Sequence, residues 1–223
     1  MISLEEIRKY DTKSMYSTYD SWDIIAEKFF NMEFQSLSIN NVENFVFAGM
    51  GGSGTIGDIF AALFSKTNIP VTIVKGYNLP KTVNQKSLIV TTSVSGNTVE
   101  TLNILKNAKE AGINSISFSD GGKVEEYCKK NNLEFRRIEK IHSPRASLPA
   151  YLYAMLKNFE EFIPINKNEI NASIKRLKEC KKNISTENLS ENNISLNLAN
   201  QISDLPIIYY PWGLQAAAIR FKN

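Results

Sequence analysis

The chain has 223 residues, of which 43% are hydrophobic and 22% charged, and a formal net charge of +3. Because this charge is small and lysines alternate with acidic residues, the sequence lacks the basic stripe of a nucleic-acid-binding protein. The charged N-terminus is unlike a signal peptide, and no apolar run approaches the roughly 20 residues of a membrane span. We therefore expect a cytoplasmic protein without nucleic-acid or membrane partners.

The cysteine pattern predicts neither a disulfide nor a metal site. Cys128 and Cys180 lie far apart, each in a lysine-rich helical pattern, so we expect two free thiols, as is usual in a reducing cytosol. No group of His, Cys or carboxylate residues has ligand spacing. The sequence therefore predicts no metal and no cofactor.

The N-terminal segment, residues 1–40, is predicted to be a helical arm. Between residues 4 and 32, apolar side chains recur at intervals of three and four, which is typical of amphipathic helices. Asp20 or Ser21 would cap a helix between two pieces of this arm. We expect its apolar face to pack on the main body.

The segment 41–164 alternates between short apolar runs and helical patterns. Strands are expected at 44–49, 71–76, 87–93, 115–119 and 133–138, with helices between them and after the last one. Taken together, the strands are too rich in apolar residues to show a regular alternation of apolar and polar positions, which indicates a parallel sheet buried on both faces. The sequence thus predicts an α/β, flavodoxin-like, doubly wound sheet of five parallel strands with helices on both faces.

The remaining chain predicts a linker and the start of a second α/β unit. Residues 165–204 are polar, with two helical patches, and are interpreted as a helical linker. Residues 205–223 then repeat the pattern of a strand in LPIIYYPWG, a glycine turn and a helix in LQAAAIRFKN. We expect this second unit to be incomplete.

A glycine cluster follows the first strand. Gly49, Gly51 and Gly54 have the spacing G-x-G-x-x-G between a strand and a helix, as in dinucleotide-binding proteins. That fingerprint expects an acidic residue about 20 positions later, but the second strand ends at Lys75, which would suit only the 2′-phosphate of NADP. A glycine-lined wall for another polar ligand is the preferred interpretation, and a purely structural turn is the other alternative.

A hydroxyl-rich loop, TTSVSGNT at 91–98, follows the third strand. Ser93, Ser95 and Thr98 supply hydroxyls, while Gly96 lets the backbone curl so that its amides point inward. With a helix beginning immediately afterwards, this loop suits a phosphate monoester held by neutral donors. A plain turn is the alternative, but both loops follow strands at the crevice of a doubly wound sheet.

Two further features bear on acid–base chemistry. Asn97 and Glu100 have the spacing of a capping box, which would account for Glu100 without a catalytic role. His142, the single histidine of the chain, lies three residues before Arg145 and so near the expected crevice. A lone histidine beside a loop is more often a solvated, hydrogen-bonded residue than a catalytic one.

Three motifs in order resemble those of a known family. The signature S-x-S-G-N-T resembles that of sugar isomerase (SIS) domains, which bind phosphosugars. Together with GMGGSG after the first strand and SPRASLP at 143–149, it makes nearly the whole chain similar to the bifunctional phosphoglucose/phosphomannose isomerases of archaea and some bacteria. The resemblance implies reversible conversion of glucose 6-phosphate and mannose 6-phosphate to fructose 6-phosphate, with a phosphorylated hexose as ligand, in a homodimer.

The resemblance also implies roles for individual residues. The sugar would be lined by Gly51, Gly52 and Ser53, the phosphate held by Ser93, Ser95 and Thr98, and the reacting carbons approached by Arg145. Arg145 would be the catalytic residue, because isomerisation through a cis-enediolate develops an oxyanion that a permanently charged, rigid guanidinium stabilises.

The chain departs from the family's pattern after IRFKN. The family's catalytic glutamate and ring-opening histidine lie further along, beyond Asn223, so we expect this chain to be a fragment that lacks the catalytic base. The alternative is a shortened relative that binds a phosphosugar without turning it over, as a sensor or binding module. A third hypothesis, an NADP-dependent oxidoreductase, requires a response to NADP and none to sugar phosphates.

Overall fold

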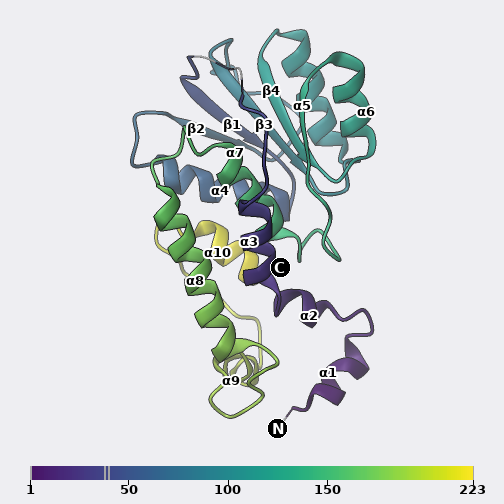
Figure 1. Cartoon of the computed structure of the whole chain (residues 1–223), viewed down its shortest axis with the longest axis vertical. Helices are drawn as coiled ribbons and strands as arrows, with labels where there is room; N and C mark the ends of the chain where they lie inside the picture. Colours follow the sequence, from purple (N-terminus) through teal and green to yellow (C-terminus); the bar gives the residue numbers. More distant parts are fainter. Residues whose placement is uncertain (1, 38, 40, 223) are drawn as a thin grey trace.

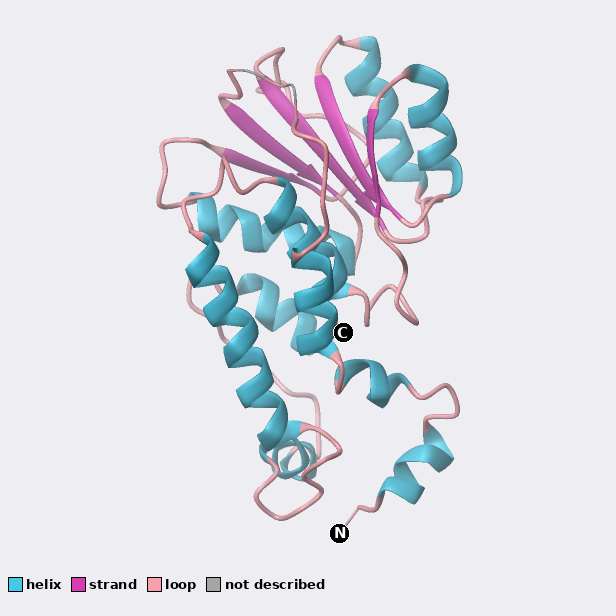
Figure 2. Ribbon diagram, in the orientation of Figure 1, coloured by secondary structure: helices cyan, strands magenta, loops and turns pink. Residues whose placement is uncertain are grey.

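The computed structural model describes residues 2–37, 39 and 41–222 as a parallel sheet with helices on both sides and a helical extension (Figures 1 and 2). The strands are β1 (Asn44–Ala48), β2 (Val71–Val74), β3 (Ser87–Ser93), β4 (Asn114–Ser119) and β5 (Glu134–Arg137). The helices are α1 (Leu4–Tyr10), α2 (Met15–Tyr19), α3 (Trp22–Phe30), α4 (Gly52–Phe64), α5 (Val99–Glu110), α6 (Gly122–Asn131), α7 (Leu148–Asn158), α8 (Lys167–Ile184), α9 (Ile194–Gln201) and α10 (Gln215–Lys222).

The sheet confirms the predicted fold class. Its order is β2-β1-β3-β4-β5 and all neighbours are parallel, with Ala48 opposite Val74 in β2 and Thr91 in β3. Every residue of β3 is buried, as expected for the central strand of a sheet covered on both faces. The chain order reverses between β1 and β3, so the ends of these two strands form the topological switch point.

Each face of the sheet has its own core, and β1 divides its side chains between them. Phe45 and Phe47 belong to a large aromatic cluster with residues of α3, α4 and α7. Val46 and Ala48 belong to a second cluster with Ile104 and other residues of α5. The alternation follows from the two-residue period of a strand, and it explains why an uninterrupted apolar run is needed here.

The N-terminal helices differ in how firmly they contact the main body. In α3, Ile25, Ala26, Phe29 and Phe30 are buried against α7 and α8, whereas α1 and α2 bury no residue and extend away from the sheet (Figure 1). The packing expected for the arm is therefore found in α3. None of the described helices combines the length and apolar character needed to cross a lipid bilayer.

The strand predicted in LPIIYYPWG is not formed. Residues 205–210 run without regular structure between α9 and α10 (Figure 1), with Leu205 and Tyr209 each 90% exposed. A strand requires a hydrogen-bonding neighbour, and this segment pairs with none of the strands of the described sheet. The helix predicted after it is present as α10, which packs on α4 and buries Ala216.

The two thiols are both free, as predicted, but their environments differ. Cys128 in α6 is fully buried and its Sγ lies 3.4 Å from Ser117 Oγ, whereas Cys180 in α8 is half-buried. Burial raises the pKa of the Cys128 thiol, which further lowers its thiolate fraction near neutral pH.

We therefore expect a thiol reagent to label one of the two cysteines in the folded protein. Iodoacetamide at pH 8 should modify Cys180 and leave Cys128 intact, as read by peptide mass spectrometry, while both should react in 8 M urea. Cys180→Ser should abolish labelling of the folded protein. Equal labelling of both thiols without denaturant would contradict the packing of α6 against β4.

Candidate functional site

The candidate site is formed by the loops that follow β1 and β3, which meet at the switch point of the sheet. A side chain at Gly49 would place its Cβ 3.1 Å from the carbonyl oxygen of Thr92, so the two strand ends are in close contact. The same Cβ would lie 3.0 Å from the backbone of Ser53 at the start of α4. The first and third strands thus present the glycine cluster and the hydroxyl loop side by side.

The glycine cluster is needed for the tight turn from β1 into α4. Gly51 has φ of +53°, a conformation that residues with a Cβ rarely adopt. A Cβ at Gly54 would lie 2.7 Å from the carbonyl oxygen of Gly49, and one at Gly57 would lie 2.8 Å from Phe47 Cβ. These glycines let α4 begin directly above β1, with its N-terminus at the candidate site.

Lys75, which directly follows β2, forms an ion pair. Its Nζ lies 2.7 Å from Oδ2 of Asp58, a side chain of α4 that is only 5% exposed. The pair accounts for a lysine at this position, because a buried carboxylate needs a cationic partner. Lys75 is therefore explained without an NADP 2′-phosphate.

The hydroxyl loop is closed by its own side chains. Ser93 Oγ and Thr98 Oγ1 lie 2.8 Å apart across the loop, Ser93 being buried and Thr98 half-buried. Ser95 is exposed at the tip, where its Oγ accepts a hydrogen bond of 3.3 Å from the amide of Asn97. Gly96 has φ of +67° and its amide donates to the Ser93 carbonyl at 3.0 Å, which produces the curl that the sequence predicted.

The predicted capping box of Asn97 and Glu100 is wrong. The N-cap of α5 is Thr98, without a side-chain cap, and Asn97 instead donates to the Ser95 carbonyl at 3.0 Å. Asn97 Oδ1 accepts from the amide of Lys123 at 3.3 Å, so its side chain joins the hydroxyl loop to the start of α6. As no side chain caps α5, the N–H groups of its first turn remain available to an anion.

A pocket of about 440 Å³ lies beside the start of α4 and brings together residues from four distant parts of the chain. Its lining consists of Met15, Gly51, Gly52, Ser143, Pro144, Arg145 and Arg220. Three residues predicted from the sequence, Gly51, Gly52 and Arg145, therefore share one pocket. Ser53 lies in the first turn of α4, and the hydroxyl loop is not part of this lining.

Arg145 is held in place through its backbone neighbours. Ser147 is fully buried, and its Oγ accepts from the Ile141 amide at 2.9 Å and lies 2.7 Å from the Ser143 carbonyl oxygen. Trp22 of α3 donates its indole N–H to the carbonyl of Ala146 at 3.0 Å. These bonds fix the loop between β5 and α7 while the Arg145 side chain stays exposed at the pocket.

Arg220 is a pocket residue that the sequence analysis missed. It lies in α10, is half-buried, and donates from Nη2 to the carbonyl oxygen of Arg145. Burial and the nearby charge of Arg145 lower the pKa of its guanidinium group. A single arginine within the small and apolar residues of AAAIRF was the available signal, but nothing in the sequence placed α10 over α4.

His142 does not line the pocket. It has φ of +60° and its Nε2 lies 2.9 Å from the carbonyl oxygen of Lys13, so the exposed ring contacts the turn between α1 and α2. This contact agrees with the hydrogen-bonded alternative considered above. Within the described part of the chain, no three His, Cys, Asp or Glu side chains gather as metal ligands would.

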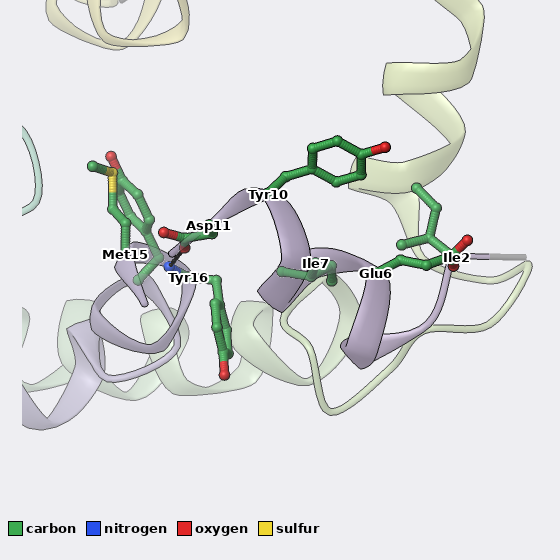
Figure 3. Close-up of a pocket in the computed structure, with 8 residues that line it drawn as sticks. Ile2, Glu6, Ile7, Tyr10, Asp11, Met15 and Tyr16 are labelled. Carbon is green, nitrogen blue, oxygen red and sulfur yellow. Dashed lines mark hydrogen bonds between the residues drawn. The ribbon is translucent and has the colours of Figure 1, made fainter. Parts of the chain in front are cut away.

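A second hollow lies between α1 and α2 and contains none of the predicted site residues (Figure 3). Its lining residues, which lie between Ile2 and Tyr19 in the sequence, are mainly apolar. The Asp11 carboxylate accepts a hydrogen bond of 2.7 Å from the amide of Tyr16 (Figure 3). That hydrogen bond, with a second from the backbone of Met15, lowers the pKa of Asp11. The carboxylate thus stabilises the start of α2.

The sheet and its two loops define a doubly wound α/β protein with a candidate site at the carboxyl edge of β1 and β3. The chain belongs to the SIS domain family, whose model matches residues 38–155. This range contains β1–β5, both loops and the Arg145 segment, and it confirms the family predicted from the three motifs.

Curated relatives are similar over most of this chain. A bifunctional phosphoglucose/phosphomannose isomerase of Caldicellulosiruptor bescii is 30% identical over 184 residues, covering 78% of this chain and 54% of the relative. One from Aquifex aeolicus is 30% identical over 83% of this chain and 56% of the relative. A D-glucosamine-6-phosphate 4-epimerase of Sulfolobus acidocaldarius is 25% identical over 94% of this chain and 64% of the relative. The chain spans about half the length of the first two relatives.

Solved structures share the fold. A protein of Clostridium novyi, named as a candidate tagatose-6-phosphate ketose/aldose isomerase, matches with a TM-score of 0.61 and 13% identity, over 96% of this chain and 58% of that one. The hypothetical protein TT0462 of Thermus thermophilus matches with a TM-score of 0.59 and 16% identity, over 87% of this chain and 50% of that one. At these identities the matches show the fold alone.

Proposed function

We propose that this chain forms the phosphosugar-binding half of an aldose–ketose isomerase that interconverts glucose 6-phosphate and mannose 6-phosphate with fructose 6-phosphate. The observation that carries the proposal is that Gly51, Gly52 and Arg145 line one pocket at the start of α4, next to the contact between Gly49 and Thr92 at the ends of β1 and β3. The similarity to bifunctional isomerases over most of the chain supports the same substrates.

In this proposal the phosphate is held by the hydroxyl loop. Ser93, Ser95 and Thr98 provide neutral donors, and the uncapped first turn of α5 adds backbone N–H groups at the positive end of its helix dipole. The sugar then extends toward the start of α4, where Gly51, Gly52 and Ser53 allow a close backbone approach.

Isomerisation moves a proton between C1 and C2 through a cis-enediolate, whose developing oxyanion is stabilised by the guanidinium of Arg145. The residues that line the pocket include no carboxylate and no imidazole, so the pocket itself supplies no group that could take the proton. We propose that the base and the ring-opening acid lie outside these 223 residues.

The first test of the proposal measures ligand binding, and the second measures turnover. The chain should bind fructose 6-phosphate but not fructose in a calorimetric titration, because the phosphate supplies the main polar contacts. Thr98→Val should weaken binding about tenfold, the effect of removing one hydrogen bond to a charged group. Thr82→Val, an exposed threonine outside both loops, is the matched control.

Turnover of fructose 6-phosphate to glucose 6-phosphate or mannose 6-phosphate is followed in the same samples. Binding without turnover is the expected result. Turnover that Arg145→Ala abolishes would place the base within this chain and correct that part of the proposal. A response to NADP with none to sugar phosphates would overturn it in favour of an oxidoreductase.

The second candidate function is a non-catalytic phosphosugar-binding module or sensor. It is favoured by the lack of an acid–base group among the pocket residues. A longer chain that extends past Asn223 distinguishes the two functions, since it should isomerise fructose 6-phosphate only if the first proposal is correct.

We also propose that the protein acts as a homodimer in the cytoplasm. The two free thiols support a reducing compartment. Exposed apolar side chains at Leu205, Ile207 and Trp212 support burial against further protein surface. The proposed division of the chain is unchanged: an arm at 1–40, an SIS domain at 41–164, a linker at 165–204 and the start of a second unit at 205–223.

A further inference from the structure

We propose that Arg220 is a second binding cation of the pocket and that, with Arg145, it makes the pocket prefer sugar phosphates bearing a negative group at the end remote from the phosphate. The inference deepens the proposed function and rests on it.

Arg220 lies between the start of α4 and the loop that carries Arg145. Its helix, α10, packs on α4 (Figure 1), and its Nη1 atom lies 2.9 Å from the point that a Cβ of Gly52 would occupy. Its Nη2 atom donates to the Arg145 carbonyl. The guanidinium group therefore spans the pocket from the start of α4 to the Arg145 loop.

The positive charges of the two arginines are not compensated by acidic partners within the described part of the chain. Neither Arg145 nor Arg220 forms an ion pair with any residue in the ranges 2–37, 39 and 41–222. Burial lowers the pKa of the half-buried Arg220 guanidinium, and the nearby charge of Arg145 acts in the same direction, whereas Tyr19 acts in the opposite one. Arg220 is thus partly desolvated near a like charge, and an anion bound beside the two guanidinium groups would lower that cost.

Gly52 and the Arg220 guanidinium group lie in close contact. A Cβ at position 52 would come within 2.9 Å of Nη1 of Arg220, so the guanidinium group would have to shift, and glycine lets Arg220 keep its present position. Arg220 also holds the backbone at Arg145, because its Nη2 bond ties the carbonyl of that residue to α10. Arg220 thus both orients Arg145 and adds charge of its own.

The chemistry of the ligand follows from the two ends of the site. The hydroxyl loop holds the phosphate through neutral donors, so a second negative charge on the ligand faces the arginines. An enediolate carries such a charge at C1 and C2, and a carboxylate at C1 carries it permanently. The pocket should therefore distinguish 6-phosphogluconate from glucitol 6-phosphate, which differ in having a carboxylate or a hydroxymethyl group at C1.

The test is a calorimetric titration of the full chain with each of these two ligands. The wild-type chain should bind 6-phosphogluconate at least about tenfold more tightly, and Arg220→Gln should reduce that ratio about tenfold, as expected for one charge-assisted hydrogen bond. The affinity for glucitol 6-phosphate should change less than threefold. Arg220→Lys should give an intermediate affinity ratio, because lysine keeps the positive charge but lacks the planar guanidinium group with donors on both sides.

Arg176→Gln is the matched control, because Arg176 lies on α8, where its exposed side chain pairs with Glu179. It should leave the affinity ratio unchanged. An unchanged ratio in Arg220→Gln, or equal weakening of both ligands, would overturn the inference while leaving the proposed function intact. If the wild-type chain binds neither ligand, the proposed function and the inference both fail. Circular dichroism confirms that each variant is folded.

Discussion

Replacing Gly96 by alanine is expected to destabilise the protein by more than about 4 kcal/mol, a cost seen only for severe local conflicts. The added Cβ would lie 1.7 Å from the carbonyl oxygen of Gly121 and 2.8 Å from Ser119 Oγ. Gly121 lies in the loop after β4 and Ser119 is the last residue of that strand, so the loop must move away for the variant to fold. Residue 96 also has φ of +67°, which adds about 1–2 kcal/mol of backbone strain for alanine.

Gly112→Ala separates these two effects. Gly112 has the same φ of +67°, but a Cβ there would meet no atom within 4 Å. Urea denaturation followed by circular dichroism should therefore show a loss of about 1–2 kcal/mol for Gly112→Ala, from backbone strain alone. Equal losses for the two variants would mean that the loops after β3 and β4 do not pack as described.

Gly96→Ala is also expected to alter the hydroxyl loop of the candidate site. Gly96 accepts a hydrogen bond of 2.9 Å from the amide of Val124, and Asn97 accepts one from Lys123, so the hydroxyl loop and the start of α6 are joined. Moving these loops apart would displace Ser95 from its neighbours. We expect Gly96→Ala to lose fructose 6-phosphate binding even where it remains folded at low temperature.

Phe159→Ala is expected to cost about 3–5 kcal/mol, the range for removing a fully buried phenylalanine from a core. Phe159 ends α7 and is fully buried. Its ring makes edge-to-face contacts with Phe45, Phe60 and Phe118 at centroid distances of 5.8, 5.9 and 5.7 Å. The substitution removes the ring that connects β1, β4 and α4 on this face of the sheet.

The midpoint of urea denaturation, at an unchanged slope, measures this loss. Phe162→Ala is the matched control, because Phe162 is only half-buried at the rim of the cluster and should cost less. A cost for Phe159→Ala no greater than that for Phe162→Ala would contradict the central position of Phe159. Binding of fructose 6-phosphate by the folded fraction should persist, since this cluster contains none of the proposed ligand contacts.

The sequence by itself determined the sheet and the two loops of the site. Parallel strands buried on both faces must be apolar throughout, so the runs at 44–49 and 87–93 could be recognised without any tertiary information. Gly51 and Gly96 could be assigned to turns because positive φ angles favour glycine. In the flavodoxin-like strand order that the sequence predicted, the carboxyl ends of β1 and β3 meet at the switch point, so the proximity of the two loops followed from that fold.

Other features of the structure depended on which residues, distant in sequence, come into contact in the fold. Asn97 could cap its own helix or bond to another loop, and only the approach of α6 decided for the second. Residues 205–210 have the composition of a strand, but a strand forms only where a neighbour offers its backbone. Arg220 lies 75 residues from Arg145 in sequence and reaches it only because α10 packs on α4. Local patterns determine the elements, whereas hydrogen-bond partners and charge neighbours are set by long-range packing.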